Sequence, residues 1–313
     1  MPNCKFIFER DPPLYKCGER VSGNIEIAFS KEQSLEDLRI VFRGMATVRW
    51  VDTMARFPKI YTGEETYMEL ETLVYQGGIL PAGTYNYAFD YVVPDVCATT
   101  CTTEIGRIFY EIILIVAYKA KSEARKFSKE IMVLQTFNIE KVPNTLLPIV
   151  RSDEMFFCCW PCSAGPVTVH LKVNSGAYIP GSIIKFSIEL ANMSKRCKFR
   201  TRATTYFIQV YKFTTQVPRR RIRYMSYILN SVENRVVVKS DDIVVVDEQL
   251  AVPPLPPSTQ GIHIISIKYE LRLEMSISTI SQAKVDLIIP ILIGSSAEIL
   301  PEHTRTKTKS RRW

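Results

Sequence analysis

One pattern occurs twice in this chain of 313 residues. Residues 15–27 and residues 178–190 share a tyrosine, a glycine, a β-branched residue, an isoleucine, a glutamate and an aliphatic residue in one register. A Tyr-Glu pair follows in each half, at 110–111 and at 269–270, so the spacing repeats as well. Because solenoid repeats span only about 20–50 residues, this long period indicates two tandem domains of one fold. We expect Tyr15 and Tyr178, and likewise Tyr110 and Tyr269, to occupy equivalent strands.

Both halves have the hydrophobic pattern of β-strands. Aromatic residues occupy alternate positions in 85–91, and apolar residues alternate with Arg39, Arg43 and Arg49 in 38–50, which places them on one buried face of a strand. The runs 108–118 and 287–293 are apolar at nearly every position, which is typical of central strands buried on both faces. Turn signals rich in Gly and Pro separate these runs. The sequence therefore predicts an all-β protein with helix content below about one tenth.

The expected architecture is two tandem antiparallel β-sandwich domains of immunoglobulin-like type. We place the first domain at residues 1–145 and the second at 146–300, with a short basic tail at 301–313. Hydrophobic residues make up 46% of the chain, which is enough for two ordinary cores. The sequence has no apolar run of the roughly 18 residues that a membrane span needs. The charged amino terminus predicts no signal peptide, so the eight cysteines are expected to be thiols in a reducing cytosol.

Several sequence motifs resemble those of a known family. Residues 42–50 (Phe-Arg-Gly-x-Ala-x-Val-x-Trp), 80–89 and 106–112 resemble the amino-terminal arrestin domain. Residues 158–167, 252–257 and 290–294 resemble the carboxy-terminal arrestin domain. Only fourteen residues separate Tyr91 from Gly106, which leaves no room for the amphipathic helix that visual and β-arrestins carry there. The chain therefore resembles the α-arrestin, or arrestin domain-containing, branch.

The resemblance implies a cytoplasmic adaptor that engages membrane-protein cargo in trafficking, endocytosis or ubiquitin-linked sorting, peripheral to the plasma membrane or to endosomes. A second hypothesis is a lipid-associated or retromer-subunit-like interaction protein that recruits no ubiquitin ligase. Relatives in this family recruit WW-domain ligases through Pro-Pro-x-Tyr motifs in a long tail. Here nineteen residues follow Gly294, and they contain no such motif. Capture of a WW-domain ligase, or of transmembrane cargo, would distinguish the two hypotheses.

The sequence contains one Pro-Pro-x-Tyr match, at Pro12, Pro13 and Tyr15. Prolines favour the extended polyproline conformation that WW domains bind, so this segment is a candidate WW ligand. Tyr15 is also the repeat tyrosine, and Tyr178 holds the same place without the two prolines. We therefore favour a structural role for Tyr15, in which the folded protein does not bind a WW domain.

Basic residues form the candidate partner-binding surface of a chain with net charge +8. Four of them alternate along one predicted strand, and three more occupy a predicted hairpin tip. They are Arg196, Lys198, Arg200 and Arg202, and Arg219, Arg220 and Arg221. Alternate residues share one face of a strand, so the first set could bind acidic or phosphorylated cargo segments or an anionic membrane surface. A solvated sheet face and an ordinary polar loop are the alternatives. Nucleic acid is not expected, because no recognition motif accompanies the charge.

Cysteines raise one further hypothesis. Cys158, Cys159 and Cys162, together with Cys97 and Cys101, supply enough thiols for a tetrahedral zinc site. Small buried thiols are the favoured interpretation, and palmitoylation or redox contact with thioredoxin, known for one α-arrestin relative, are the others. We therefore predict no metal and no cofactor. The sequence also lacks a phosphate loop, a Gly-x-Ser-x-Gly elbow and a His-Glu-x-x-His motif, so we do not expect an enzyme.

Overall fold

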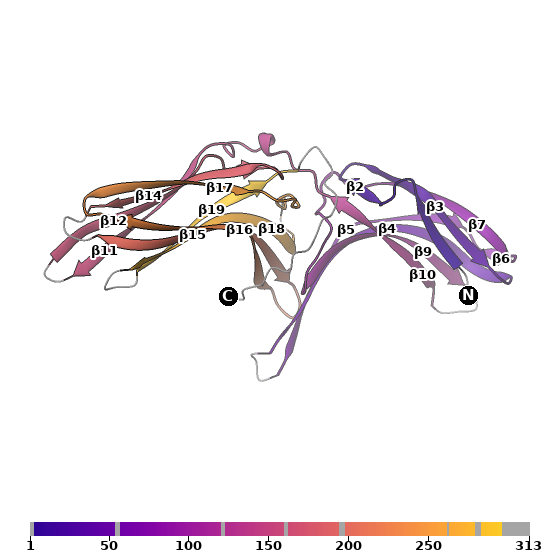
Figure 1. Ribbon diagram of the computed structural model, residues 1–313. Helices are drawn as coiled ribbons and strands as arrows, with labels where there is room; N and C mark the ends of the chain where they lie inside the picture. Colours follow the sequence, from indigo (N-terminus) through magenta and orange to yellow (C-terminus); the bar gives the residue numbers. More distant parts are fainter. Residues whose placement is uncertain are drawn as a thin grey trace. The chain divides into compact units, whose positions relative to one another are not determined.

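A computed structural model describes residues 3–53, 57–119, 123–159, 162–193, 198–261, 263–278 and 283–295. The chain forms two compact units (Figure 1). Unit 1 comprises Met1–Thr136, Phe213–Arg223 and Thr259–Ser266, and unit 2 comprises Phe137–Lys212, Tyr224–Ser258 and Ile267–Trp313. Two short segments from the second half of the sequence thus belong to unit 1.

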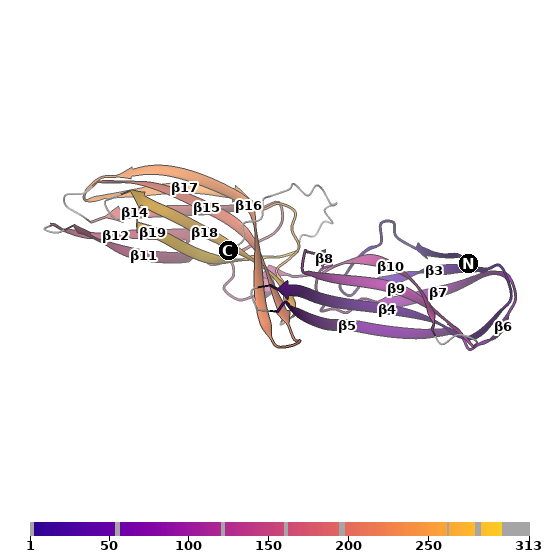
Figure 2. The ribbon, with the colours of Figure 1, turned by 90° about the horizontal axis from the view of Figure 1, so that it is seen from below.

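Unit 1 is a sandwich of two sheets. Its strands are β1 (Asn3–Phe8), β2 (Leu14–Lys16), β3 (Arg20–Phe29), β4 (Gln33–Asp52), β5 (Lys59–Tyr75), β6 (Gly78–Leu80), β7 (Gly83–Val92), β8 (Cys101–Thr102), β9 (Gly106–Tyr118) and β10 (Arg125–Leu134). One sheet has the order β1-β3-β7 and the other β2-β10-β9-β4-β5, with β6 beside β4 and β8 beside β9. Figure 2 shows β10, β9, β4 and β5 side by side. β2 joins β10 in parallel, and the other neighbours run antiparallel.

Unit 2 is a second sandwich. Its strands are β11 (Ile149–Cys159), β12 (Cys162–Val173), β13 (Ala177–Tyr178), β14 (Ile183–Asn192), β15 (Phe199–Thr215), β16 (Arg221–Val238), β17 (Asp242–Ala251), β18 (Ile265–Ser278) and β19 (Ala283–Ile293). The two sheets have the orders β11-β12-β14-β17 and β13-β19-β18-β15-β16. Their inward-facing residues form one apolar core.

The predicted fold is confirmed: the described residues are almost entirely β-strand. Within them, helical structure is limited to a 3₁₀ turn, η1 (Ile139–Lys141). The described part of the chain contains no helix with the length and apolar character to span a membrane. The alternation predicted for 38–50 is also confirmed, since Leu38, Ile40 and Phe42 are buried on β4. The run 287–293 is different, because β19 buries only alternate residues and leaves Ile288 37% exposed; the expectation that both its faces are buried was wrong.

The repeated motifs occupy equivalent places in the two units, as expected. Tyr15 lies on β2, which pairs in parallel with β10, and Tyr178 lies on β13, which pairs in parallel with β19. Tyr110 on β9 and Tyr269 on β18 lie one strand further in. Their hydroxyl groups donate to the carbonyls of Ala98 (2.7 Å) and Pro256 (2.6 Å), so each tyrosine holds the loop that precedes its strand.

The backbone conformation explains why each repeat has a glycine at this position. Gly18 and Gly181 have φ values of 81° and 87°, which residues with a Cβ adopt at a cost. Their N–H groups donate to the carbonyls of Val93 (3.0 Å) and Val252 (2.9 Å). The same left-handed turn therefore leads into β3 and into β14.

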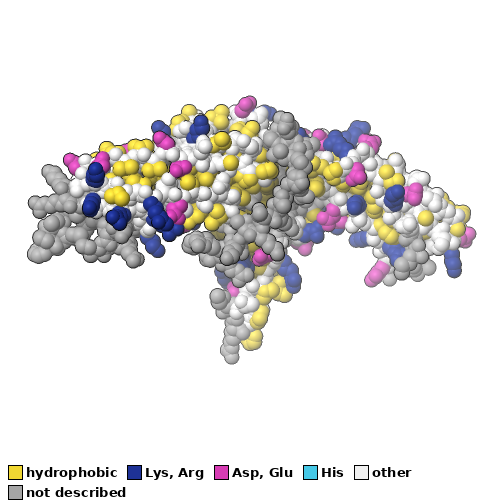
Figure 3. Space-filling view, in the orientation of Figure 1, with side chains coloured by type: hydrophobic (Ala, Val, Ile, Leu, Met, Phe, Trp, Pro, Cys, Tyr) yellow, Lys and Arg dark blue, Asp and Glu magenta, His cyan; other side chains and the backbone are white. Residues whose placement is uncertain are grey.

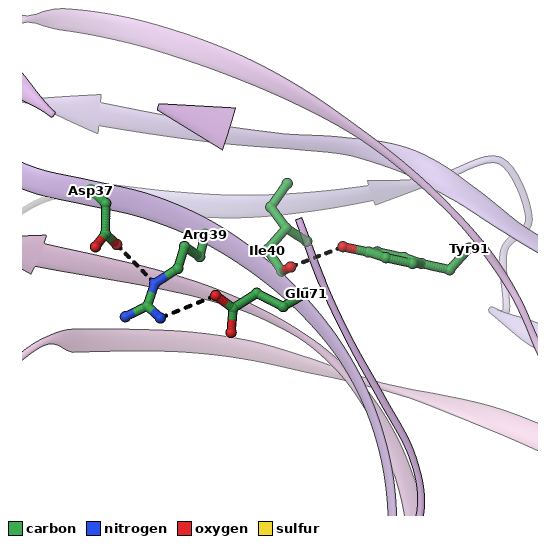
Figure 4. Close-up of polar contacts among 5 residues, drawn as sticks. All are labelled: Asp37, Arg39, Ile40, Glu71 and Tyr91. Carbon is green, nitrogen blue, oxygen red and sulfur yellow. Dashed lines mark hydrogen bonds and ion pairs between the residues drawn. The ribbon is translucent and has the colours of Figure 1, made fainter. Parts of the chain in front are cut away.

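Polar contacts also join the two sheets of unit 1 (Figure 4). Tyr91 of β7 donates its hydroxyl proton to the Ile40 carbonyl of β4 across the sandwich, at 2.9 Å. On the outer face of β4, Arg39 contacts Asp37 at 2.9 Å and Glu71 of β5 at 3.1 Å. Of the arginines predicted for the solvated face of this strand, Arg39 is therefore linked to β5 through Glu71, and Arg43 contacts Glu111 of β9 at 2.6 Å.

Candidate interaction surface

The alternating basic residues lie on the outer face of β15, with Lys198 just before the strand begins. Lys198, Arg200 and Arg202 are exposed, whereas Phe199, Thr201 and Ala203 between them are buried. The two-residue period of a strand accounts for this division. Arg196 lies outside the described residues. The three described basic residues thus share one solvent-facing row.

One acidic residue of the neighbouring strand reaches this row. Glu233 of β16 accepts hydrogen bonds from Arg202 and from Arg235, the latter at 3.1 Å. These bonds, the one from Arg202 first, hold the pKa of the Glu233 carboxyl below its ordinary value. Within the described residues, neither Lys198 nor Arg200 has an acidic partner within ion-pair distance.

We call Lys198, Arg200, Arg202 and Arg235 the β15 basic face. Four positive charges and the single carboxylate of Glu233 leave it with a net excess of positive charge. On β18, the next strand on the other side, Glu274 also faces outward, because Leu273 and Met275 are buried. Figure 3 shows how basic and acidic side chains intermingle on one side of the molecule. The β15 basic face is therefore a local excess of positive charge rather than a broad field.

The second basic set lies at the turn between β15 and β16. Arg219, Arg220 and Arg221 are exposed, and the Arg221 guanidinium lies 5.8 Å from the ring centroid of Tyr61. The turn belongs to unit 1, whereas the β15 basic face belongs to unit 2. The predicted hairpin position is confirmed, and the binding role of these arginines stays a prediction.

This turn covers the free edge of β5. The backbones of Thr62 and Val217 exchange two hydrogen bonds, of 2.9 and 3.0 Å. The side chain of Gln216 accepts from the N–H of Glu64 at 3.0 Å. A paired edge cannot add a foreign strand at that point, so the turn protects β5 there.

A second segment of unit 1 that the sequence did not reveal is Thr259–Ser266. Glu65 of β5 accepts from His263 Nδ1 at 2.7 Å and from the Ile264 N–H at 2.9 Å. Because a carboxylate can only accept, Nδ1 carries the proton. The bond to Glu65 raises the pKa of His263. Burial alone would raise the pKa of Glu65, but its bonds to His263 and Ile264 leave that pKa below the ordinary value.

The tyrosine of the candidate WW ligand is buried, whereas Pro12 is exposed. Tyr15 is 1% exposed, and the Arg10 guanidinium lies 5.0 Å from its ring centroid. The Pro12 carbonyl accepts from the Leu14 N–H at 2.9 Å, and the Pro13 carbonyl accepts from Met132 N–H at 2.9 Å. Tyr15 is therefore a core residue in the folded chain, which agrees with the structural role favoured from the sequence.

The cysteines proposed as zinc ligands are described only in part. The backbones of Cys159 and Cys162 lie opposite each other in β11 and β12, and the side chains of Cys158, Cys159 and Cys162 lie outside the described part. In the region that the structure describes, no three His, Cys, Asp or Glu side chains are grouped to hold a metal ion. The carbonyl of Cys97 instead accepts a hydrogen bond from the Cys17 thiol at 3.6 Å, a partner that the sequence did not indicate.

Comparisons with known proteins agree with the geometry. The family model "Arrestin (or S-antigen), N-terminal domain" matches residues 4–140, and "Arrestin (or S-antigen), C-terminal domain" matches residues 163–298. The chain is 24% identical over 312 residues to arrestin domain-containing protein 17 of Caenorhabditis elegans, covering 94% of this chain and 71% of that protein. It is 25% identical over 294 residues to human arrestin domain-containing protein 4, covering 90% and 68%. Arrestin domain-containing protein 1 of Mus musculus is 22% identical over 285 residues, covering 91% and 62%.

Proposed function

The chain belongs to the α-arrestin family of arrestin domain-containing proteins, and on that premise we propose that it is a cytoplasmic adaptor for membrane-protein cargo. It binds acidic or phosphorylated cytoplasmic segments of that cargo in trafficking, endocytosis or ubiquitin-linked sorting. The binding surface is the β15 basic face. Family membership supports the adaptor class, and the charge and exposure of this surface support the chemistry of the ligand.

The observation that carries the proposal is the pair of cations Lys198 and Arg200, for which the described part of the chain supplies no acidic partner. Both are exposed, and their row continues into Arg202, whose partner Glu233 is shared with Arg235. Like charges on one strand face repel each other, so an anionic ligand that neutralises them would be favoured. An arginine also offers a planar fork that matches carboxylate and phosphate groups.

The test is peptide binding by the intact chain. Replacing Lys198 and Arg200 with glutamine removes two exposed charge pairs of about 0.5 kcal/mol each, so affinity should fall about fivefold. Fluorescence anisotropy with doubly phosphorylated and unphosphorylated peptides measures this loss. Binding should weaken as salt rises, because the Debye length is about 8 Å at physiological ionic strength. The melting temperature should stay nearly unchanged, since surface substitutions shift stability by less than about 0.5 kcal/mol.

A matched control removes the same charge elsewhere in unit 2. Lys172 of β12 and Lys185 of β14 are exposed on the other sheet, so Lys172→Gln with Lys185→Gln should bind like the original chain. Equal affinity of both double variants would refute the proposed surface. Binding of anionic vesicles but not of phosphopeptides, lost in the Lys198 and Arg200 variant, would instead favour the lipid-associated alternative.

Ligase recruitment by Pro12–Tyr15 is not part of the proposal. A WW domain binds an extended ligand, and Tyr15 would have to leave the core and its neighbours on β10 to provide one. The proposed adaptor therefore holds cargo through unit 2 without using this segment.

A further inference from the structure

Two thiols that are far apart in sequence meet in unit 1. The Cys17 Sγ lies 3.6 Å from the carbonyl oxygen of Cys97, which is 80 residues further along the chain. The Cys17 thiol is the donor in this contact, and the Cys97 side chain is the leading cause that lowers the pKa of Cys17. Cys17 is half-buried, whereas Cys97 is buried. Cys17 is therefore the more accessible of the two residues to a small reagent.

Backbone hydrogen bonds fix Cys17 in place. The Cys17 N–H donates to the Leu134 carbonyl at the end of β10, at 3.1 Å. The next N–H, that of Gly18, donates to the Val93 carbonyl at 3.0 Å. The turn after β2 is thus bonded both to β10 and to the loop that contains Cys97.

The loop that carries Cys97 is fixed against the same strand end. Thr100 N–H donates to the Val133 carbonyl at 2.9 Å, and Thr99 Oγ1 accepts from the Gln135 N–H at 3.0 Å. The Tyr110 hydroxyl donates a hydrogen bond to the Ala98 carbonyl at 2.7 Å. Because both backbones are held, the thiols stay within reach of each other in the native fold.

The surroundings also favour the thiolate form of Cys17. A hydrogen bond from the Cys97 side chain, followed by backbone hydrogen bonds that include Thr136, lowers the pKa of Cys17 to about 7. Burial raises the pKa of Cys4 and of Cys101 to about 11. Hydrogen bonds lower the pKa of Cys17 against the opposing effect of its burial. Reactivity follows the thiolate, so Cys17 differs from these other thiols.

We propose that Cys17 and Cys97 form a peroxide-sensitive thiol pair, in which Cys17 is oxidised first and Cys97 then closes a reversible disulfide. This site is independent of the β15 basic face and of the proposed cargo. A disulfide needs a sulfur–sulfur distance of about 2.05 Å, so the Cys17 sulfur must turn from the Cys97 carbonyl oxygen, which lies 3.6 Å away, to the Cys97 sulfur by side-chain rotation.

The chemistry is a two-electron oxidation by hydrogen peroxide. The Cys17 thiolate attacks one peroxide oxygen, so that an S–O bond forms, the O–O bond breaks, and the departing hydroxide takes a proton from solvent and leaves as water. Cys17 is then a sulfenic acid. The Cys97 sulfur attacks Cys17 Sγ, forming the S–S bond and breaking the S–O bond, and the thiol proton leaves with the hydroxide as a second water.

The second step is helped by the first. The hydrogen bond with Cys17 is the leading cause that raises the pKa of Cys97, and the charge of the Cys17 thiolate adds to it. Conversion of Cys17 to a neutral sulfenic acid removes that charge. Cys97 therefore becomes easier to deprotonate once its partner is oxidised.

The experiment uses the full chain, treated with a small excess of hydrogen peroxide, then alkylated and mapped by mass spectrometry without reduction. We expect a peptide cross-linked between Cys17 and Cys97 that dithiothreitol releases. With a Cys17 pKa of about 7, the initial rate should rise about tenfold between pH 6 and pH 8, following the thiolate fraction. The closed loop should also raise the melting temperature by several degrees.

Two variants separate the steps. In Cys97→Ser, the sulfenic acid of Cys17 should persist and react with dimedone. In the control Cys101→Ser, the cross-link should form at the original rate. Oxidation of Cys4 or Cys101 before Cys17, or oxidation of Cys17 with no link to Cys97, would overturn the proposal. If Cys97→Ser does not fold, the peptide map and pH profile of the unaltered chain decide alone.

Discussion

Replacement of Glu65 by alanine tests whether the segment Thr259–Ser266 is held in unit 1 by one carboxylate. The side chains of Glu65 and His263 are 24% and 14% exposed, and Ile264 is buried. The substitution leaves the Ile264 N–H without its acceptor, which costs about 1–3 kcal/mol, and removes a partly buried ionic hydrogen bond. We expect the free energy of unfolding to fall by about 2–3 kcal/mol.

The pH dependence of that loss follows from the two pKa shifts. The pKa of His263 is raised above its ordinary 6.5. The contribution of His263 to the stability of the fold is therefore complete below pH 6.5 and is lost as pH rises through the raised value. The pKa of Glu65 is lowered below its ordinary 4.5, so its contribution is present above pH 4.5 and is lost as pH falls through the lowered value. The difference in the free energy of unfolding between the original chain and Glu65→Ala should therefore be largest between about pH 4.5 and 6.5.

Urea unfolding at pH 5.5 and at pH 8.5, followed by tryptophan fluorescence, measures both effects. The matched control is Asp90→Ala, which breaks an ion pair with Arg20 whose side chains are 69% and 52% exposed. It should shift stability by less than about 0.5 kcal/mol at either pH. Equal midpoints for Glu65→Ala and the original chain at pH 5.5, or a larger loss at pH 8.5, would refute the argument.

Two further predictions concern the core of unit 1. A WW domain should bind an isolated peptide containing Pro12–Tyr15 but not the folded chain. Because Tyr15 is 1% exposed, Tyr15→Ala should lower the free energy of unfolding, measured in urea, by about 3–5 kcal/mol. Micromolar WW binding to the intact chain that is lost in a folded Tyr15→Ala variant would contradict this prediction. Gly44→Ala should cost about 1–3 kcal/mol, because the added Cβ would lie 2.5 Å from Tyr110 Cε1, whereas Gly83→Ala, with its nearest contact at 3.7 Å, should be nearly neutral. Equal stability of the two glycine variants would contradict the second prediction.

Local patterns were enough to predict the fold. The repeat of tyrosine and glycine reflects the same strand pairing and the same left-handed turn in both units, as at Gly18 and Gly181. Strand alternation correctly divided Lys198 to Ala203 into exposed and buried residues. It failed at 287–293, because an apolar composition does not distinguish a strand buried on both faces from one that leaves Ile288 in solvent.

Contacts between distant residues could not be predicted in this way. Glu65 and His263 are 198 residues apart, and Cys17 and Cys97 are 80 residues apart, so neither pair leaves a periodic signal. The Glu233 carboxylate beside Arg202 was missed for a related reason. Strand order and register bring it there, and a single strand's sequence contains neither.

The most direct test of the adaptor proposal is to locate where an anionic ligand binds. A doubly phosphorylated peptide with a photoreactive group can be cross-linked to the intact chain at low salt, and the modified residues identified by mass spectrometry. We predict cross-links on β15 and β16 around Lys198, Arg200 and Arg235, which disappear when unlabelled phosphopeptide competes. Cross-links confined to unit 1, including the turn at Arg219–Arg221, would contradict the assignment of the β15 basic face as the cargo-binding surface.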